Sequence, residues 1–311
     1  MKPEIIQYCP LMPGLEAALA ERFTVHRFFE DKDPDGFLTR HAGAIRGFVT
    51  GGHLGLPPDL GAKLPALEIV AINGVGFDKV DLVEAKRRGI RVANTPDVLT
   101  EDVADLAIGL SIALLRQIVK GDAYVRAGQW LGGDLALGAK VSRRRFGIFG
   151  LGRIGRAIAR RLEGFDAQIA YSDRVKLDVP YAFEVTPQAL AARSDVFVVA
   201  AAASAETRNV IDRSVIDAVG PKGILVNVAR GSLVDEPALL AALKEGRIGG
   251  AALDVFADEP RVPDGFFGLP NVVLTPHMAS ATGETRQAMA DLVLANLVAH
   301  FAGEPLPTAL V

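Results

Sequence analysis

The segment 146–155, FGIFGLGRIG, limits the possible folds of this 311-residue chain more than any other. It begins with an apolar run typical of a buried strand. Gly150, Gly152 and Gly155 then follow in the spacing G-x-G-x-x-G, directly before a helical pattern. Gly150 permits a tight turn, Gly152 lets the backbone approach a pyrophosphate, and Gly155 lets the helix pack closely on the strand. Because a helix N-terminus attracts anions, the segment predicts a dinucleotide-binding turn.

The residues after this turn favour nucleotide binding over an ordinary glycine-rich connection between a strand and a helix. Apolar residues recur at helical spacing from Ile154 to Leu162, and Gly164 is placed to end that helix. A second strand, 168–171, ends about twenty residues beyond the turn, where such units contact the adenosine ribose. Arg153 and Ile154, at the start of the helix, are therefore candidate cofactor contacts together with the three glycines.

Length and composition narrow the possible functions. The chain is long enough for two domains, and with half its residues apolar and 23% charged it has the composition of a folded protein. Its net charge is −3 and no basic block exceeds Arg143–Arg145, so we expect no nucleic-acid partner. One cysteine, Cys9, allows no intrachain disulfide or cysteine metal site, so we expect a cytoplasmic protein without a metal. The N-terminus lacks a signal-peptide pattern and the apolar stretches are too short to span a bilayer, so we expect no export and no membrane association.

Short strands and helices alternate along the chain, which predicts an α/β architecture with parallel sheets. The chain is expected to cross between domains at Asn94-Thr95-Pro96, before a long apolar helix at Glu101–Val119. In the first part we expect strands Ile5–Tyr8, Gly47–Thr50, Glu68–Ile72 and Arg91–Ala93, and helices Gly14–Glu21 and Val80–Arg88. Beyond Tyr171 we expect strands Val196–Ala201, Ile224–Val228, Ala251–Val255 and Val272–Leu274, and helices Pro187–Arg193, Asp235–Glu245 and Thr282–His300.

A second glycine turn, Asn73-Gly74-Val75-Gly76, follows the strand expected at Glu68–Ile72. Closely spaced glycines expose backbone N–H groups that can hold an anion. An ordinary turn between a strand and a helix explains these residues equally well.

Three polar residues come just after expected strands, at the sheet edge where such folds bind ligands. Each has a structural explanation: His277 can hydrogen-bond a loop, Glu259 can be a solvated carboxylate, and Arg230 can pair with a nearby acid. Together they provide a cation for a carboxylate, a proton carrier and a carboxylate to charge it. This combination suits a 2-keto or 2-hydroxy acid beside a nicotinamide.

Five motifs in this order resemble those of the D-2-hydroxyacid dehydrogenases: NTPDVLTEDVADLAIGL, GIFGLGRIG, LVNVARGSLVDEPAL, ALDVFADEP and LTPHMASAT. The resemblance covers nearly the whole chain and is strongest to the glyoxylate/hydroxypyruvate reductases. It implies a Rossmann-type, doubly wound parallel sheet in residues 100–283. This domain would be inserted into a smaller, flavodoxin-like substrate-binding domain formed by residues 1–99 and 284–311. It also implies a homodimer that forms through the helix Glu101–Val119 and the adjoining segment up to Trp130.

The same resemblance implies a role for each candidate residue. Arg230 would bind the carboxylate and carbonyl of a 2-keto or 2-hydroxy acid, His277 would act as acid and base, and Glu259 would orient and charge His277. The 73–76 turn would also contact the substrate carboxylate. Thr100 and Asp254 would contact the cofactor, with Asp254 facing the nicotinamide amide.

The chain departs from the family pattern after Tyr171. Members that use NAD usually have an acidic residue at the next position, whereas this chain has Ser172, followed by Asp173 and Arg174. An acidic group there binds the ribose hydroxyls of NAD, and a nearby arginine accommodates the 2′-phosphate of NADP. Ser172 and Arg174 therefore predict a preference for NADP(H). NAD(H) stays possible because Asp173 could turn toward the ribose.

Reduction of a short 2-keto acid is the leading interpretation, with other functions open. A phosphoglycerate dehydrogenase would use the same three catalytic residues, although Ser172 argues against it. A formate dehydrogenase is disfavoured because its histidine partner is not a glutamate. A nucleotide-sensing protein without turnover is an alternative from another class, as in the corepressors of the family.

Overall fold

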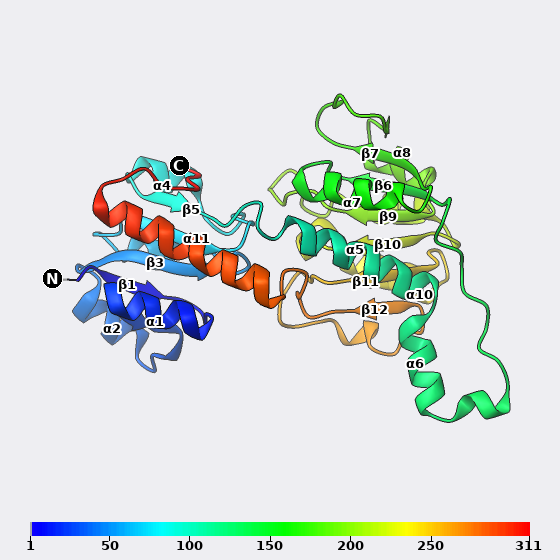
Figure 1. The fold of residues 1–311 in the computed structure, drawn as a ribbon, viewed down its shortest axis with the longest axis horizontal. Coiled ribbons are helices and arrows are strands. Elements are labelled where there is room, and N and C mark those ends of the chain that lie inside the picture. Colours follow the sequence, from blue (N-terminus) through cyan, green and yellow to red (C-terminus); the bar gives the residue numbers. More distant parts are fainter. Residues whose placement is uncertain (1) are drawn as a thin grey trace. The chain divides into compact units, whose positions relative to one another are not determined.

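The computed structural model describes residues 2–311, which form two compact units (Figure 1). One unit contains the described residues up to Leu99 together with Ala281–Val311, and the other contains Thr100–Ser280. Each unit is an α/β body built on its own fully parallel sheet. The second unit ends three residues before the boundary expected from the sequence.

The sheet of the first unit has the strand order β2-β1-β3-β4-β5, which is the flavodoxin-like order. Ile5 packs against helices on one face, α1 and α11, while Ile6 packs against α2, α3 and α4 on the other. The strands are β1 (Glu4–Gln7), β2 (Thr24–Arg27), β3 (Ile45–Gly51), β4 (Ile69–Asn73) and β5 (Arg91–Ala93). The helices are α1 (Pro13–Arg22), η1 (Phe28–Glu30), α2 (Pro34–His41), α3 (Pro58–Ala62), α4 (Leu82–Arg87) and α11 (Gly283–Ala302).

The sheet of the second unit has the order β12-β11-β10-β9-β6-β7-β8. From β6, the strands β7 and β8 follow in one direction and β9 to β12 follow in the other, so the order reverses between β6 and β9. This is the Rossmann arrangement with a seventh strand, and it confirms the doubly wound fold. The strands are β6 (Arg145–Phe149), β7 (Gln168–Ser172), β8 (Ala182–Phe183), β9 (Val196–Val199), β10 (Ile224–Asn227), β11 (Gly250–Leu253) and β12 (Val272–Leu274).

Helices cover both faces of this second sheet. One face packs on α8, α9 and α10 through residues such as Phe197 and Leu225, and the other faces α5 and α7 (Figure 1). The helices are α5 (Thr100–Leu115), α7 (Arg153–Glu163), α8 (Pro187–Ala192), α9 (Arg213–Val219) and α10 (Glu236–Lys244). Short 3-10 turns are η3 (Gly231–Leu233) and η4 (Asp264–Phe266). In the described part of the chain, no helix is both long and apolar enough to cross a membrane.

The prediction of a single helix at Glu101–Val119 is wrong. The chain forms two helices here, α5 and α6 (Ile118–Arg126), and α6 turns away from α5 (Figure 1). Gln117 adopts the left-handed conformation, with φ of 55°, and Leu115 ends α5 by accepting a hydrogen bond from the Ala139 N–H at 2.7 Å. The break therefore comes from the returning segment after η2 (Gln129–Gly132), which binds the end of α5.

Candidate active site and nucleotide-binding loop

The candidate residues that follow strands in the second unit share one edge of its sheet. The strands β6, β9, β10, β11 and β12 are parallel and in register, with Ile148 opposite Val198 and Val226 opposite Val198 and Ala252. Their carboxyl ends therefore lie together, and parallel sheets bind ligands at that edge.

The glycine turn after β6 has the geometry of a nucleotide loop. A Cβ on Gly150 would lie 2.4 Å from the Ala201 Cα, and one on Gly155 would lie 2.1 Å from the Gly150 carbonyl oxygen. These two positions therefore need glycine for backbone packing. Gly152, the N-cap of α7, has no atom of the described chain within 4 Å of its Cβ position. The space beside Gly152 is open where a diphosphate would approach, so the turn fits a dinucleotide.

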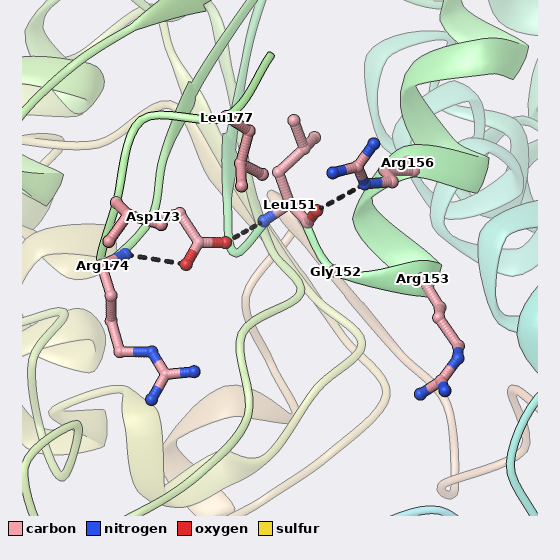
Figure 2. A pocket seen from close by; sticks show the side chains of 8 residues that line it. Leu151, Gly152, Arg153, Arg156, Asp173, Arg174 and Leu177 are labelled. Carbon is pink, nitrogen blue, oxygen red and sulfur yellow. Dashed lines mark hydrogen bonds between the residues drawn. The ribbon is translucent and has the colours of Figure 1, made fainter. Parts of the chain in front are cut away.

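A pocket of about 590 Å³ opens beside this turn (Figure 2). Arg153 and Arg174 extend from opposite sides of the pocket, and Asp173 is turned toward Leu151. Arg156 Nε donates to the Leu151 carbonyl at 3.3 Å. The lining residues are Leu151, Gly152, Arg153, Arg156, Asp173, Arg174, Val175 and Leu177. Three guanidinium groups against one carboxylate make this pocket electropositive.

Asp173 has a defined place beside the glycine turn. Its Oδ2 accepts a hydrogen bond from the Leu151 N–H at 2.8 Å, and its Oδ1 accepts one from the Arg174 N–H at 2.7 Å. The carboxylate therefore braces the turn instead of pairing with the Arg174 or Lys176 side chain. Ser172 is 2% exposed, and its carbonyl accepts from the Gly150 N–H at 2.9 Å. Ser172 thus contributes to the turn through its backbone.

Arg230 lies in the loop after β10, where it is half-buried. Its carbonyl accepts from Asn227 Nδ2 at 3.0 Å, and its own Nη1 donates to the Ala229 carbonyl at 2.8 Å. The next residue, Gly231, brings this loop against the one after β11, since a Cβ there would lie 2.0 Å from the carbonyl carbon of Phe256. The loop of Arg230 and the loop of Glu259 therefore pack together only because residue 231 is glycine.

Glu259 and His277 form a close pair. Glu259 Oε2 lies 2.6 Å from His277 Nδ1, and Glu259 Oε1 accepts the Phe256 N–H at 2.9 Å. The side chains are 18% and 31% exposed, so the pair is partly shielded from water. Because Nδ1 faces the carboxylate, Nε2 is the ring nitrogen that we expect to exchange a proton with a ligand.

Asp254 holds the segment that carries His277. It is fully buried, and its carboxylate accepts hydrogen bonds from the Thr275 hydroxyl at 2.6 Å and from the Met278 and Ala279 N–H groups at 2.9 and 3.0 Å. Its carbonyl oxygen accepts the His277 N–H at 2.8 Å, and His277 has a φ of 49°. Asp254 is therefore a positioning residue for His277. Its expected contact with a nicotinamide amide stays a prediction.

This chain matches the family model of the D-isomer specific 2-hydroxyacid dehydrogenase, NAD binding domain, over residues 108–279. It is 51% identical to the hydroxyphenylpyruvate reductase of Plectranthus scutellarioides and 51% identical to glyoxylate/hydroxypyruvate reductase A of Arabidopsis thaliana. Each alignment covers 99% of this chain and 98% of the relative. The chain belongs to the D-isomer specific 2-hydroxyacid dehydrogenases. This confirms the resemblance drawn from its motifs.

The fold of this dehydrogenase is also that of solved relatives. The NADPH-dependent glyoxylate/hydroxypyruvate reductase of Sinorhizobium meliloti, determined with NADP and malonate, superposes with a TM-score of 0.94. The two sequences are 42% identical, and the match covers 100% of this chain and 97% of the other.

Glu236 is a residue of this dehydrogenase that the sequence analysis missed. Its Oε1 accepts the Ala257 N–H at 2.7 Å, which holds the loop leading to Glu259. Burial raises the pKa of Glu236, the bond from Ala257 opposes the rise, and the nearby carboxylates of Glu259 and Asp258 add to it. A carboxylate at the start of α10, directly after a candidate substrate loop, is the signal that could have indicated this role.

The remaining candidates lie elsewhere in the dehydrogenase. Thr100 begins α5 and is half-buried. The 73–76 turn belongs to the first unit, where the Thr95 N–H donates to the Gly74 carbonyl at 2.9 Å and Asn94 Nδ2 donates to the Val75 carbonyl at 2.8 Å. Within the described residues, Asn73 Oδ1 is buried without a hydrogen-bond partner. Such an atom calls for an explanation, and a ligand at this turn would supply one.

Proposed function

We propose that this dehydrogenase reduces a short 2-keto acid of the glyoxylate or hydroxypyruvate type to the D-2-hydroxy acid, with NADPH as the reductant. The observation that carries the proposal is the pair His277–Glu259 at the same sheet edge as an open nucleotide loop. The names of relatives that are 51% and 42% identical support the substrate class.

The residues of the chain divide the reaction between them. When bound, the reduced nicotinamide supplies a hydride to the carbonyl carbon. His277 gives the proton from Nε2 to the carbonyl oxygen, while Glu259 holds Nδ1 and orients the ring. The Arg230 guanidinium binds the substrate carboxylate, for which its planar fork is suited. The 73–76 turn of the first unit is proposed to bind a carboxylate through backbone N–H groups.

The electropositive pocket beside the glycine turn supports NADPH over NADH. Arg174 is exposed and Arg153 lies opposite it, so two cations could receive a 2′-phosphate. Asp173 could still accept a ribose hydroxyl, because a carboxylate has more lone pairs than the two backbone N–H groups occupy. NADH therefore remains a usable second coenzyme.

A substrate panel read by coenzyme absorbance tests the proposed function. Glyoxylate, hydroxypyruvate, pyruvate, phosphohydroxypyruvate and hydroxyphenylpyruvate are each offered with NADPH and with NADH. Every product except the achiral glycolate is resolved by chiral chromatography. We expect the highest kcat/KM for glyoxylate or hydroxypyruvate with NADPH, and the D-product from hydroxypyruvate. Preference for phosphohydroxypyruvate with NADH would identify a phosphoglycerate dehydrogenase. Preference for hydroxyphenylpyruvate would favour the aromatic substrate named for the Plectranthus relative. NADPH binding without turnover of any acid would indicate a sensor.

We further propose that the protein is a homodimer. Residues 118–137 expose apolar side chains on α6, on η2 and in the segment after it, with Leu131 and Leu137 each 97% exposed and Trp130 65% exposed. Exposed apolar groups gathered in one projecting segment are typical of an interface, and a second copy would bury them. Light scattering at micromolar concentration should give twice the chain mass, and Leu131→Asp should shift it toward the monomer. A monomeric parent protein would contradict the proposal.

A cytoplasmic location also belongs to the proposal. Cys9 is buried, and burial raises its pKa to about 11, so its thiol stays protonated at neutral pH. A single protonated, buried thiol is suited to a reducing compartment and forms no disulfide in the folded chain.

A further inference from the structure

Three side chains with metal-binding chemistry meet in the first unit, far in sequence from the residues described above. Glu4 lies on β1, His26 on β2, and His41 is the last residue of α2. Glu4 Oε2 is 2.8 Å from His26 Nε2 and 3.9 Å from His41 Nδ1. One ligand atom from each residue lies within 4.8 Å of the other two.

The fold brings this trio together. In the parallel pair β1–β2, Glu4 is opposite Thr24 and Ile6 is opposite His26, so Glu4 and His26 are diagonal neighbours on one face of the sheet. That face packs on α2, whose C-terminal residue is His41. The trio is thus built on two strands and one helix, which are the rigid elements that a metal site needs.

The Phe37 ring packs against both imidazole rings. It is 5% exposed, stacks on His41 with ring centroids 4.9 Å apart, and meets His26 edge-on at 5.0 Å. The two imidazoles are themselves 4.9 Å apart. Packing of this kind restricts the ring orientations and reduces the entropy that metal binding would cost.

We propose that Glu4 Oε2, His26 Nε2 and His41 Nδ1 bind a divalent transition-metal ion of the Zn²⁺ type, with water as the fourth ligand. Bonds of about 2.0–2.1 Å in a tetrahedron place ligand atoms about 3.3 Å apart, and the two distances from Glu4 bracket this value. Imidazole and carboxylate together suit Zn²⁺, Cu²⁺ or Ni²⁺, whereas Mg²⁺ and Ca²⁺ prefer oxygen ligands alone.

The surroundings admit water and a cation. A pocket of about 410 Å³ opens beside the two histidines, and its lining includes Arg27 and Arg40. Both arginines are near carboxylates that offset their charge: Arg27 pairs with Glu16 and Glu30, and Arg40 lies 4.0 Å from Asp33. The bound ion would join β1, β2 and α2 and stabilise the first unit, separately from hydride transfer.

Titration of the untagged, full-length protein after treatment with a chelator tests the site. Co²⁺ is followed by its visible d–d absorption, and Zn²⁺ is followed by calorimetry and by its competition with Co²⁺. We expect one ion per chain and a higher thermal unfolding temperature with Zn²⁺. His41→Ala and His26→Gln should each weaken binding more than about 100-fold, since loss of even an outer partner of a ligand costs 10–100-fold.

A matched control separates this site from other histidines. His300 also pairs with a glutamate in the first unit, at 3.2 Å from Glu68, and His300→Gln should leave metal binding unchanged. If His26→Gln does not fold, His41→Ala and Glu4→Gln still decide, because both residues are partly exposed. Absence of binding by the parent protein, or binding unchanged in the variants of the trio, would overturn the proposal.

Discussion

The two ends of the site on the second sheet differ in how their polar groups are held. At the catalytic end, each carboxylate is bonded to the protein: Glu259 to Phe256 and His277, and Asp254 to three donors of the 275–279 segment. At the nucleotide end, Gly152 faces open space and Arg174 extends into solvent. One end is arranged before ligands arrive, and the other leaves room for them.

This difference indicates what each end must do. The proposed proton transfer would require His277 within hydrogen-bond reach of the reacting oxygen, and a support that is fixed in advance suits this role. The coenzyme brings its own phosphates and can order side chains as it binds. Substitutions at the catalytic end should therefore lower kcat or stability, whereas substitutions at the nucleotide end should change coenzyme affinity.

The largest effect is expected from His277→Gln. Removal of the proton carrier should lower kcat by about 10²–10⁴-fold, the usual contribution of a positioned acid. Coenzyme affinity, measured by fluorescence titration, should stay at the parental value. His300→Gln provides the control, since His300 forms a similar pair with Glu68 in the first unit. If the variant lost coenzyme affinity to the same degree as kcat, the catalytic end would not act separately from the nucleotide end.

Arg230→Lys should be nearly as harmful, because an ammonium lacks the planar fork that binds a carboxylate through two hydrogen bonds. We expect kcat/KM for the keto acid to fall about 30- to 1000-fold, or about 2–4 kcal/mol. Steady-state kinetics at saturating coenzyme provide the measurement. Near-parental kinetics would make Arg230 a structural residue of the loop after β10.

Asp254→Asn tests whether the catalytic end is held in advance. The substitution replaces one of the two carboxylate oxygens with an NH2 group. This donor would then face an N–H group of the His277 segment, which is also a donor. We expect a loss of about 1–3 kcal/mol in the free energy of unfolding, together with a lower kcat. Denaturant unfolding and kinetics should show both effects. Asp264→Asn, an exposed aspartate in the same region, should show neither. Parental stability in Asp254→Asn would rule out the positioning role.

The smallest effect is expected from Glu236→Gln, and it depends on pH. Because the pKa of Glu236 is raised in the fold, its contribution to stability is present below the ordinary value of 4.5 and is lost as pH rises through the raised pKa. Glutamine stays neutral and can still accept the Ala257 N–H. Above that range we expect the variant to gain stability on the order of 0.5 kcal/mol, measured by thermal unfolding across pH. A variant that is destabilised at every pH would show that the charge itself is needed.

Much of the fold could be predicted because its signals are local. The apolar run and glycines at 146–155 predict a strand, a turn and a helix, and the structure has β6, Gly150 and α7 there. The edge strand β2 was missed because TVHR has no buried residue and no alternation to detect. The break after Leu115 was missed because its cause, the bond from Ala139, comes from a segment that returns from far along the chain.

The candidate site follows the same rule. Residues just after strands could be found from the strand pattern, which is how Arg230, Glu259 and His277 were selected. The supporting contacts could not, because they join segments about twenty residues or more apart in sequence. Asp254 to Ala279, Glu236 to Ala257 and Gly231 to Phe256 are contacts between segments that follow different strands, and only the folded sheet edge brings these segments together.

The most direct test of the account is whether Arg174 selects the coenzyme without affecting kcat. We would measure kcat and kcat/KM for NADPH and NADH in the parent protein, in Arg174→Ala and in Lys176→Ala, an exposed cation on the same segment that does not line the pocket. We expect the parent protein to favour NADPH. In Arg174→Ala, kcat/KM for NADPH should fall by about 1.5–3 kcal/mol, or about 10- to 150-fold, with NADH and kcat nearly unchanged. A parent protein that favours NADH, or an Arg174 variant that weakens both coenzymes equally, would contradict this account.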